Sequence, residues 1–335
     1  MVGVSAGLSS FSFEAELTEE EKGLIFLRAR SAGLTFCGCA HAAFLCKLVQ
    51  SLRCIIQDPS ADRGSLASGE DSDICVGILG LGHMGKQLLL TLLEKTDIKP
   101  SYIKISTRRP ESAVESIKTG VECFFDNGRL AAWADVLFLC CLPSDLHKVC
   151  VDLHSHISKR CLVYSFTSGV PVTRLAQLLG HNFILKPQYH FFACDTTDVW
   201  QSCTHLTTAL TDPSLIEASC PLTTSGGISV GLNWVSAVLY SLLNICTYTS
   251  LGSSDALSAI NTVLNDKSPH AVELEVHSFL SSLHAAYLHK EEYFPWISLT
   301  DAQTKETPLL SFLSSSTSMQ QSISAVYKSQ LCPPH

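Results

Sequence analysis

A glycine-rich segment is the part of this sequence best suited to chemistry. An apolar run, residues 74–79, is followed by Gly80-Leu-Gly82-His-Met-Gly85 and then by a helix-forming run that begins at Lys86. In such a strand-turn-helix unit, the first glycine makes the tight turn and the second lets a pyrophosphate approach the backbone. The third lets the helix pack closely on the strand. The free N–H groups at the helix N-terminus would bind the phosphates. The spacing predicts a dinucleotide site, and a tight turn without a ligand is the alternative.

A basic loop is the second informative feature. Residues 102–106 alternate between apolar and polar side chains, which predicts a strand, and Ser106-Thr107-Arg108-Arg109 follows at its end. In an NAD site an acidic residue at this point accepts hydrogen bonds from the ribose 2′-hydroxyl. Two hydroxyls and two guanidiniums instead suit a 2′-phosphate. We therefore expect NADP(H) rather than NAD(H), and two solvated arginines in a surface loop are the alternative.

The elements that must hold these two loops alternate between strand and helix from residue 74 to residue 190. Unbroken apolar runs at 136–141 and 161–166 are typical of strands buried on both faces of a parallel sheet. This alternation predicts a Rossmann-type, doubly wound parallel sheet of the α/β class. Ligands bind at the carboxyl ends of such strands, where both loops fall.

The regions on either side of this sheet differ from it. We expect residues 1–72 to be an N-terminal helical extension and linker, 73–192 the NADP-binding Rossmann domain, and 193–335 an all-helical substrate and dimerisation domain. The extension is expected to be an appendage with two helices that end near Ile56. The first would begin at a capping box formed by Thr18 and Glu21, and the second near Gly33. The linker would occupy residues 58–73.

The expected C-terminal helices cover 231–249, 254–264, 270–289 and 318–331. The uncharged stretch 228–249 is long enough to span a membrane. Its Asn, Ser and Thr residues and its lack of flanking basic anchors favour a buried helix at a subunit interface instead.

Composition excludes several classes of protein. The chain has 335 residues, of which 46% are hydrophobic, and a net charge of −8, so it can build a large core but has no general attraction to nucleic acid. Its 15 cysteines are scattered, without a CxxC pair, which favours reduced thiols in the core over disulfides or a metal site. The N-terminus shows no secretory or mitochondrial signal, so the expected location is cytoplasmic.

These motifs together resemble the pyrroline-5-carboxylate reductase family, and within it the divergent group of NADP-dependent oxidoreductase domain-containing proteins. The resemblance rests on 76–85 as the opening glycine motif, 106–109 as the NADP-selecting loop, 134–143 as the fourth strand and 165–170 as the turn near the nicotinamide. It implies an NADP cofactor, a small-molecule substrate and a homodimer formed through the C-terminal helices.

Site residues follow from the motifs and the resemblance together. The residues expected to contact the cofactor are Gly80, Gly82, His83, Met84, Gly85, Ser106, Thr107, Arg108, Arg109, Cys141, Leu142, Pro143, Ser168 and Gly169. By resemblance, the candidate proton donors are Tyr189, Lys186, Thr224 and Ser225.

Three functions remain open, the last of them a purely structural Rossmann domain that binds no ligand. The first is an NADP(H)-dependent oxidoreductase that transfers hydride to or from an imine or carbonyl. The second is a pseudoenzyme that binds NADP(H) and acts as a redox sensor or docks a partner. The second is motivated by the N-terminal extension and by departures from the family pattern. Leu142 stands where the family has Lys, and no Ser-Pro-Gly-Gly-Thr-Thr segment is present.

Overall fold

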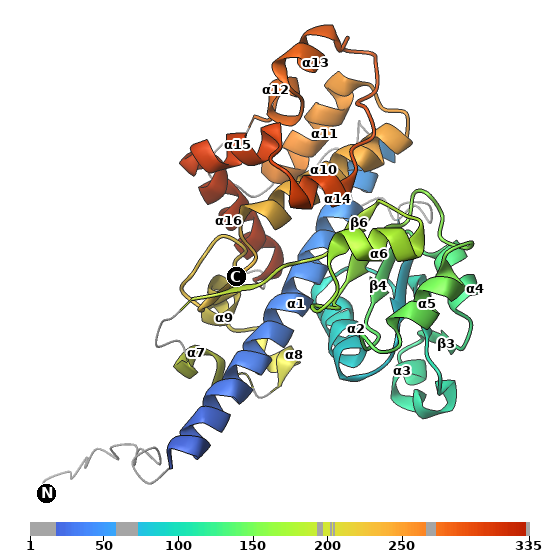
Figure 1. Ribbon diagram of the computed structural model, residues 1–335, viewed down its shortest axis with the longest axis vertical. Coiled ribbons are helices and arrows are strands. Elements are labelled where there is room, and N and C mark those ends of the chain that lie inside the picture. Colours follow the sequence, from blue (N-terminus) through green and yellow to red (C-terminus); the bar gives the residue numbers. More distant parts are fainter. Residues whose placement is uncertain are drawn as a thin grey trace, which may run out of the picture.

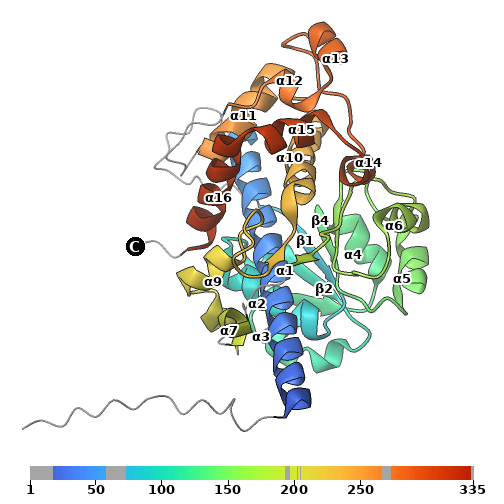
Figure 2. The same cartoon turned by 60° about the vertical axis from the view of Figure 1, so that its left-hand side comes forward.

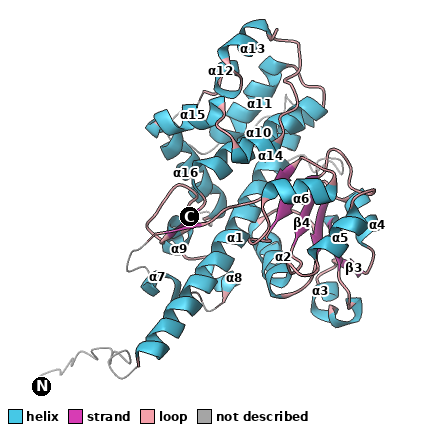
Figure 3. Ribbon diagram, in the orientation of Figure 1, coloured by secondary structure: helices cyan, strands magenta, loops and turns pink. Residues whose placement is uncertain are grey.

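A six-stranded parallel sheet, with helices packed around it, forms one side of the molecule. The computed structural model describes residues 18–57, 73–192, 197–201, 203, 205–265 and 273–332. The sheet order is β3-β2-β1-β4-β5-β6, so the winding direction reverses between β1 and β4. Figure 3 shows the strands in magenta among the helices that flank them. The strands are β1 (Val76–Leu79), β2 (Ile103–Ser106), β3 (Glu122–Phe124), β4 (Val136–Leu139), β5 (Leu162–Ser165) and β6 (Ile184–Leu185). This order confirms the predicted Rossmann-type sheet.

Helices cover both faces of this sheet. The helices within the sheet region are α2 (His83–Lys95), α3 (Val114–Lys118), α4 (Asn127–Trp133), α5 (Leu146–Leu153) and α6 (Val172–Leu179), with 3₁₀ turns at Pro100–Tyr102 and Pro110–Ser112. Alternate side chains of each strand point to opposite faces. Leu137 and Val163 therefore pack with α4, α5 and α6, whereas Phe138 and Tyr164 pack in the larger core on the other face.

The N-terminal helix α1 (Glu19–Gln57) belongs to this larger core. It is a single helix of 39 residues, so the prediction of two helices is wrong. The capping box is confirmed, because the Thr18 backbone N–H donates to Glu21 Oε2 at 2.8 Å and the Glu21 N–H donates to Thr18 Oγ1 at 3.3 Å. Most side chains from Phe36 to Leu52 are fully buried. Figures 1 and 2 show α1 running between the sheet and the C-terminal helices, so it is not an appendage. The predicted linker at 58–73 lies almost entirely outside the described residues.

An ion pair fixes the C-terminal part of α1 to the sheet. Arg53 Nη1 donates to Asp135 Oδ2 at 2.9 Å, and the Cys75 backbone N–H donates to the same oxygen at 3.0 Å. Burial alone would raise the pKa of Asp135, but the hydrogen bond and charge of Arg53 and the Cys75 N–H leave that pKa below its ordinary value. The carboxylate thus links α1 to the beginnings of β1 and β4.

The C-terminal region is helical, as predicted, apart from a two-stranded ribbon of β7 (His190–Phe191) and β8 (Ile228–Ser229). Its helices are α7 (Thr197–Gln201), α8 (Leu206–Ala209), α9 (Pro213–Ala218), α10 (Gly231–Tyr248), α11 (Ser253–Asn265), α12 (Val276–Phe279), α13 (Ser282–Tyr287), α14 (Leu299–Thr304), α15 (Pro308–Ser315) and α16 (Thr317–Leu331). The single helix predicted at 270–289 is wrong. Its described part breaks into α12 and α13, because Leu280 is extended.

The apolar helix α10 is buried within its own chain. It packs against α1, α11, α14 and α15, and its side chains from Trp234 to Leu243 are buried. The predicted burial is confirmed, but the cover comes from this chain. Among the described helices, Gly23–Gln57 of α1 is the one long and apolar enough to cross a membrane by composition, and 78% of its most apolar window is buried in the fold. Such burial is typical of a core helix.

The ion pair of α1 predicts a specific loss of stability. Replacing Arg53 by Met keeps the apolar stem but removes a charge-assisted hydrogen bond from a partly buried carboxylate, so the free energy of unfolding should fall by about 1.5–3 kcal/mol. Lys305→Met is the matched control, because its i,i+4 pair with Asp301 is exposed to solvent and should contribute only about 0.3–0.5 kcal/mol. Urea unfolding measures both variants. Equal losses would contradict the anchoring role of Arg53.

Candidate functional site

The glycine turn has the geometry of a pyrophosphate cradle. Gly80 has a φ of +98°, which favours glycine, and its N–H donates to the Ser106 carbonyl at 2.9 Å. A Cβ on Gly85 would lie 2.0 Å from the Gly80 carbonyl oxygen, so only glycine lets α2 begin this close to β1. A Cβ on Gly82 would meet nothing within 4 Å, so the space above this residue is open. These features fit a dinucleotide at the N-terminus of α2, where the N-cap Gly82 provides no side-chain cap.

The predicted NADP-selecting loop lies beside this turn, at the carboxyl end of β2. Arg108 and Arg109 are exposed, and Arg108 Nη2 lies 3.4 Å from Asp145 Oδ2 in the loop after β4. This ion pair joins the loop after β2 to the loop after β4, on the two sides of the point where the winding of the sheet reverses. A 2′-phosphate would therefore compete with Asp145 for the Arg108 guanidinium.

Ser106 has a different place from its neighbours in this loop. Its side chain is buried, its Oγ donates to Asn127 Oδ1 at 2.8 Å and it accepts from the Asp126 N–H at 3.2 Å. The hydroxyl therefore holds the turn after β3 instead of facing the open crevice. Thr107 is partly exposed, and its N–H donates to the Phe124 carbonyl.

The loops after β4 and β5 leave the same edge of the sheet, beyond the point where its winding reverses. Cys141 is half-buried, and burial raises the pKa of its thiol to about 11, so it is a neutral packing group. Leu142 and Pro143 are exposed. Ser168 and Gly169 are exposed at the turn after β5. His83 and Met84 begin α2, so the structure brings the predicted cofactor residues to one edge of the sheet.

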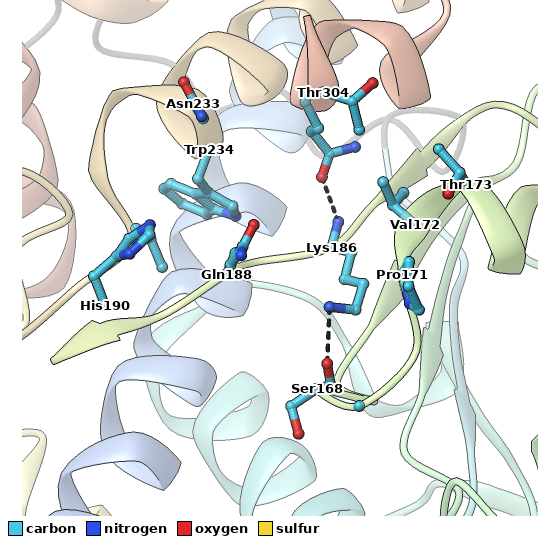
Figure 4. Close-up of a pocket in the computed structure, with 13 residues that line it drawn as sticks. Ser168, Pro171, Val172, Thr173, Lys186, Gln188, His190, Asn233, Trp234 and Thr304 are labelled. Atoms are coloured by element: carbon cyan, nitrogen blue, oxygen red, sulfur yellow. Dashed lines mark hydrogen bonds between the residues drawn. The ribbon is translucent and has the colours of Figure 1, made fainter.

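A cavity of about 300 Å³ adjoins the Ser168 turn. Its lining joins the ends of β5 and β6 to the first turn of α10 and the last turn of α14 (Figure 4). The lining residues are Ser168, Gly169, Pro171, Val172, Thr173, Lys186, Gln188, His190, Val230, Asn233, Trp234, Gln303 and Thr304. This volume can accommodate a small organic molecule next to the predicted nicotinamide position.

Lys186 is the cationic side chain of this lining. Its backbone N–H donates to Gln303 Oε1 at 2.8 Å, and its Nζ donates to the Ser168 carbonyl at 3.2 Å (Figure 4). Partial burial lowers the pKa of the Lys186 ammonium. A lower pKa brings a lysine closer to the range in which it exchanges protons at neutral pH.

Tyr189 points away from the cavity, toward α1. His41 of α1 is buried, and its Nε2 lies 2.8 Å from the Ser219 carbonyl oxygen, which can only accept. Nε2 must therefore carry the proton, and Nδ1 accepts the Tyr189 hydroxyl at 3.1 Å. Burial raises the pKa of Tyr189 well above its ordinary value. Its proton is thus committed to His41, and Tyr189 is not among the residues that line the cavity.

Thr224 and Ser225, the other candidate donors, lie in an exposed turn between α9 and β8. The Thr224 carbonyl accepts from the Gly227 N–H, and Ser225 Oγ lies 2.9 Å from Thr223 Oγ1. Neither residue lines the cavity, so the structure does not bring them together with Lys186.

Several lining residues were not found from the sequence. Trp234 and Asn233 belong to the apolar α10, where an aromatic residue is most often core, and Gln303 and Thr304 belong to a short helix without a motif. His41 is missed because it lies 148 positions from Tyr189 in a segment expected to be separate from the site. These residues meet through tertiary packing, and no local sequence signal marks them.

Comparisons with known proteins identify the family of this chain. Residues 75–169 match the family model described as NADP oxidoreductase coenzyme F420-dependent. NADP-dependent oxidoreductase domain-containing protein 1 of Mus musculus is 38% identical over 96% of this chain and 91% of its own length. Pyrroline-5-carboxylate reductase of Escherichia coli is 31% identical over 108 residues, which are 32% of this chain and 40% of that enzyme. A solved pyrroline-5-carboxylate reductase from Coxiella burnetii is 17% identical, covering 78% of this chain and 99% of its own, with a TM-score of 0.33.

The Rossmann-type sheet, the glycine turn and the match of residues 75–169 together place the chain in the class of NADP oxidoreductases. Within that class, the chain belongs to the family of NADP-dependent oxidoreductase domain-containing protein 1, because the similarity extends over nearly the full length of both chains. The resemblance and the NADP cofactor predicted from the sequence are therefore confirmed at the level of the family.

The buried His41 predicts a pH dependence of stability. Burial lowers the pKa of His41 from 6.5 to about 4. Between these values the unfolded chain binds a proton that the folded chain does not, so stability should fall as the pH drops from 6.5 toward 4. The contribution is on the order of 3 kcal/mol. His41→Gln should reduce this slope, as measured by urea unfolding from pH 4.5 to 7.5. An unchanged slope, or an NMR titration of the His41 ring near pH 6.5, would contradict it.

Proposed function

We propose that this protein is an NADP(H)-dependent oxidoreductase that transfers hydride to or from a small imine or carbonyl compound in the cavity beside Ser168. The observation that carries the proposal is the adjacency of a cavity with a partly buried Lys186 to the turn after β5, at the same sheet edge as the glycine cradle. The sequence similarity to pyrroline-5-carboxylate reductase, whose name identifies an imine substrate, supports the reaction class.

Each part of the site has a distinct task in this proposal. Bound NADPH would supply the hydride. The Gly80–Gly85 turn would bind the pyrophosphate, and Arg108 and Arg109 would bind the 2′-phosphate. Gln303 and the Ser168 carbonyl hold Lys186 at the cavity. Its Nζ would donate the proton that the reduced nitrogen or oxygen requires, a task assigned to Lys186 rather than to Tyr189, because Tyr189 donates to His41.

A pseudoenzyme that senses redox state or docks a partner is the second candidate. It is favoured because the chain lacks the family's substrate-binding segment. Near the position expected for that segment, α14 provides Gln303 and Thr304 to the cavity instead. Docking through the N-terminal helix is not favoured, because α1 from Phe36 to Leu52 is core. NADPH binding without turnover of any imine or carbonyl would support this second candidate.

The proposal also covers the oligomeric state and the cellular location of the protein. We propose a cytoplasmic protein, because the cysteines in the described part of the chain are free thiols, as is usual in a reducing compartment. A homodimer through the C-terminal helices would use their outer surface, where Leu283 and Tyr287 of α13 are exposed, since α10 is already covered. Gel filtration with light scattering tests this assembly.

The cofactor assignment predicts a selective loss of affinity. Arg108→Ala combined with Arg109→Ala should weaken NADPH binding by about 1.5–3 kcal/mol per lost charge-assisted contact and leave NADH nearly unchanged, because only NADPH carries the 2′-phosphate. Titration calorimetry measures both cofactors. Gly82→Val is the matched control, which should abolish binding of both by filling the open space at the cradle. Equal losses of NADPH and NADH in the arginine variant would show that the loop is misassigned.

The role of Lys186 predicts a change in rate and in its pH dependence. A panel of cyclic imines and ketones should include substrates that oxidise NADPH, and Lys186→Met should lower kcat for them by about 10²–10⁴-fold. The wild-type rate should fall as the pH rises through the lowered pKa of Lys186, because only the ammonium donates a proton. Lys186→Arg keeps the charge, but a guanidinium does not release its proton in the measurable pH range, so kcat should stay low and this fall should disappear. Unchanged kcat in Lys186→Met would exclude this lysine as the donor.

A further inference from the structure

A second cavity, of about 680 Å³, lies between the N-terminal half of α1 and the first turns of α2. Here α1 packs against α2 and α7, and α2 packs against α8 (Figure 1). The lining residues are Ile25, Arg28, Ala29, Ser31, Ala32, Thr35, His83, Gln87, Leu90, Trp200, Gln201, Cys203, His205, Leu206 and Thr207. None of them lines the cavity beside Ser168. The walls from α1, α7 and α8 also lie outside residues 75–169, the part that the family model matches.

The lining side chains that can carry charge near neutral pH are all basic. Arg28 of α1, His83 at the beginning of α2 and His205 before α8 are exposed to solvent. Within the described ranges these three side chains form no hydrogen bond or ion pair. The lining includes no Asp or Glu, although the chain as a whole has a net charge of −8. A cavity lined by one sign of charge attracts ligands of the opposite sign, so this lining favours an anion.

Accessible apolar surface belongs to the same lining. Leu90 of α2 is 43% exposed, and Ile25 and Ala32 of α1 are partly exposed. A bound molecule would remove this surface from water, which is favourable. An apolar body joined to an anionic group would therefore use both properties of the lining, and the volume is within the range of small-molecule sites.

We propose that this cavity is a second ligand site, which binds an amphipathic anion, that is, a small molecule with an apolar chain or ring and a single anionic group. Arg28 supplies the positive charge, and the imidazoles of His83 and His205 can each donate a hydrogen bond to the anion. The apolar side chains contact the rest of the molecule. The site uses neither the cavity beside Ser168 nor bound NADPH, so this inference does not rest on the proposed reductase function.

Three eight-carbon probes test the proposal on the full chain. Octanoate, 1-octanol and octylammonium share an apolar chain and differ in charge. Ligand-observed NMR measures their Kd values below the concentrations at which they form micelles, at about 0.15 M salt, where distant charges are screened. We expect octanoate to have the lowest Kd and octylammonium the highest. An octanoate Kd equal to or above that of 1-octanol would overturn the proposal, because the basic groups would then contribute nothing.

Methyl NMR of the chain labelled at Leu and Val locates the bound octanoate. Leu90 reports on this cavity and Val172 on the cavity beside Ser168. The signals lost in Leu90→Gln and in Val172→Ile identify the two reporters. We expect octanoate to shift the Leu90 signals and to leave those of Val172 in place. Octanoate binding that does not move Leu90 would refute the assignment of the site.

Charge variants test the role of Arg28. Arg28→Met keeps the apolar stem of an exposed side chain, so the variant should fold normally. Its Kd for octanoate should rise about 2- to 5-fold, as expected for one exposed charge pair, and its Kd for 1-octanol should not change. Arg30→Met is the matched control, because Arg30 lies over the Phe191 ring and outside this lining. Equal effects of the two arginine variants on octanoate binding would contradict the proposal.

A substitution on α2 tests the charge of the lining from the opposite wall. Leu90→Glu and Leu90→Gln both replace an exposed apolar side chain by a polar one, but only the first adds a negative charge. Leu90→Glu should therefore weaken octanoate binding more than Leu90→Gln does, and the two should bind 1-octanol alike. Equal octanoate Kd values in the two variants would show that the ligand's charge does not lie in this cavity.

Discussion

Burial of the second face of the sheet by α1 is the constraint on which the rest of this structure depends. The crossovers that place α4, α5 and α6 on one face leave Phe138 and Tyr164 to be covered on the other. The apolar segment of α1 provides that cover, and its other side packs against α10. Removing α1 would expose apolar surface on two elements at once, so the helix is as necessary to the fold as a strand of the sheet.

The same packing connects α1 to the site. His41 lies opposite the strand ends because α1 crosses behind them, and its two hydrogen bonds fix the direction of the Tyr189 proton. Tyr189 is thereby a structural hydroxyl, and Lys186 is left as the candidate donor that lines the cavity. A buried neutral histidine thus decides which side chains are available for chemistry.

The glycine turn and the place of the basic loop after β2 could be predicted from the sequence because their signals are local. Gly80 adopts a positive φ, and Gly85 allows a close approach of α2 to β1 that only glycine permits. Arg108 follows β2, whose end lies beside the glycine turn in a parallel sheet. The cavity could not be predicted in this way. Trp234, Gln303 and Lys186 come from three elements whose meeting depends on how α10 and α14 pack on β6. Tyr189, one of the four candidate donors, lies outside the cavity lining because its hydroxyl pairs with His41 of α1.

The sequence by itself determined the parallel sheet, the glycine cradle and the NADP-type loop, because hydrophobic periodicity and glycine spacing act within a few residues. Tertiary structure alone decided that α1 is a single core helix, that α10 is covered by its own chain, and which polar side chains reach the cavity. A helix with several apolar faces can pack in more than one way, and burial against particular neighbours selects one of them.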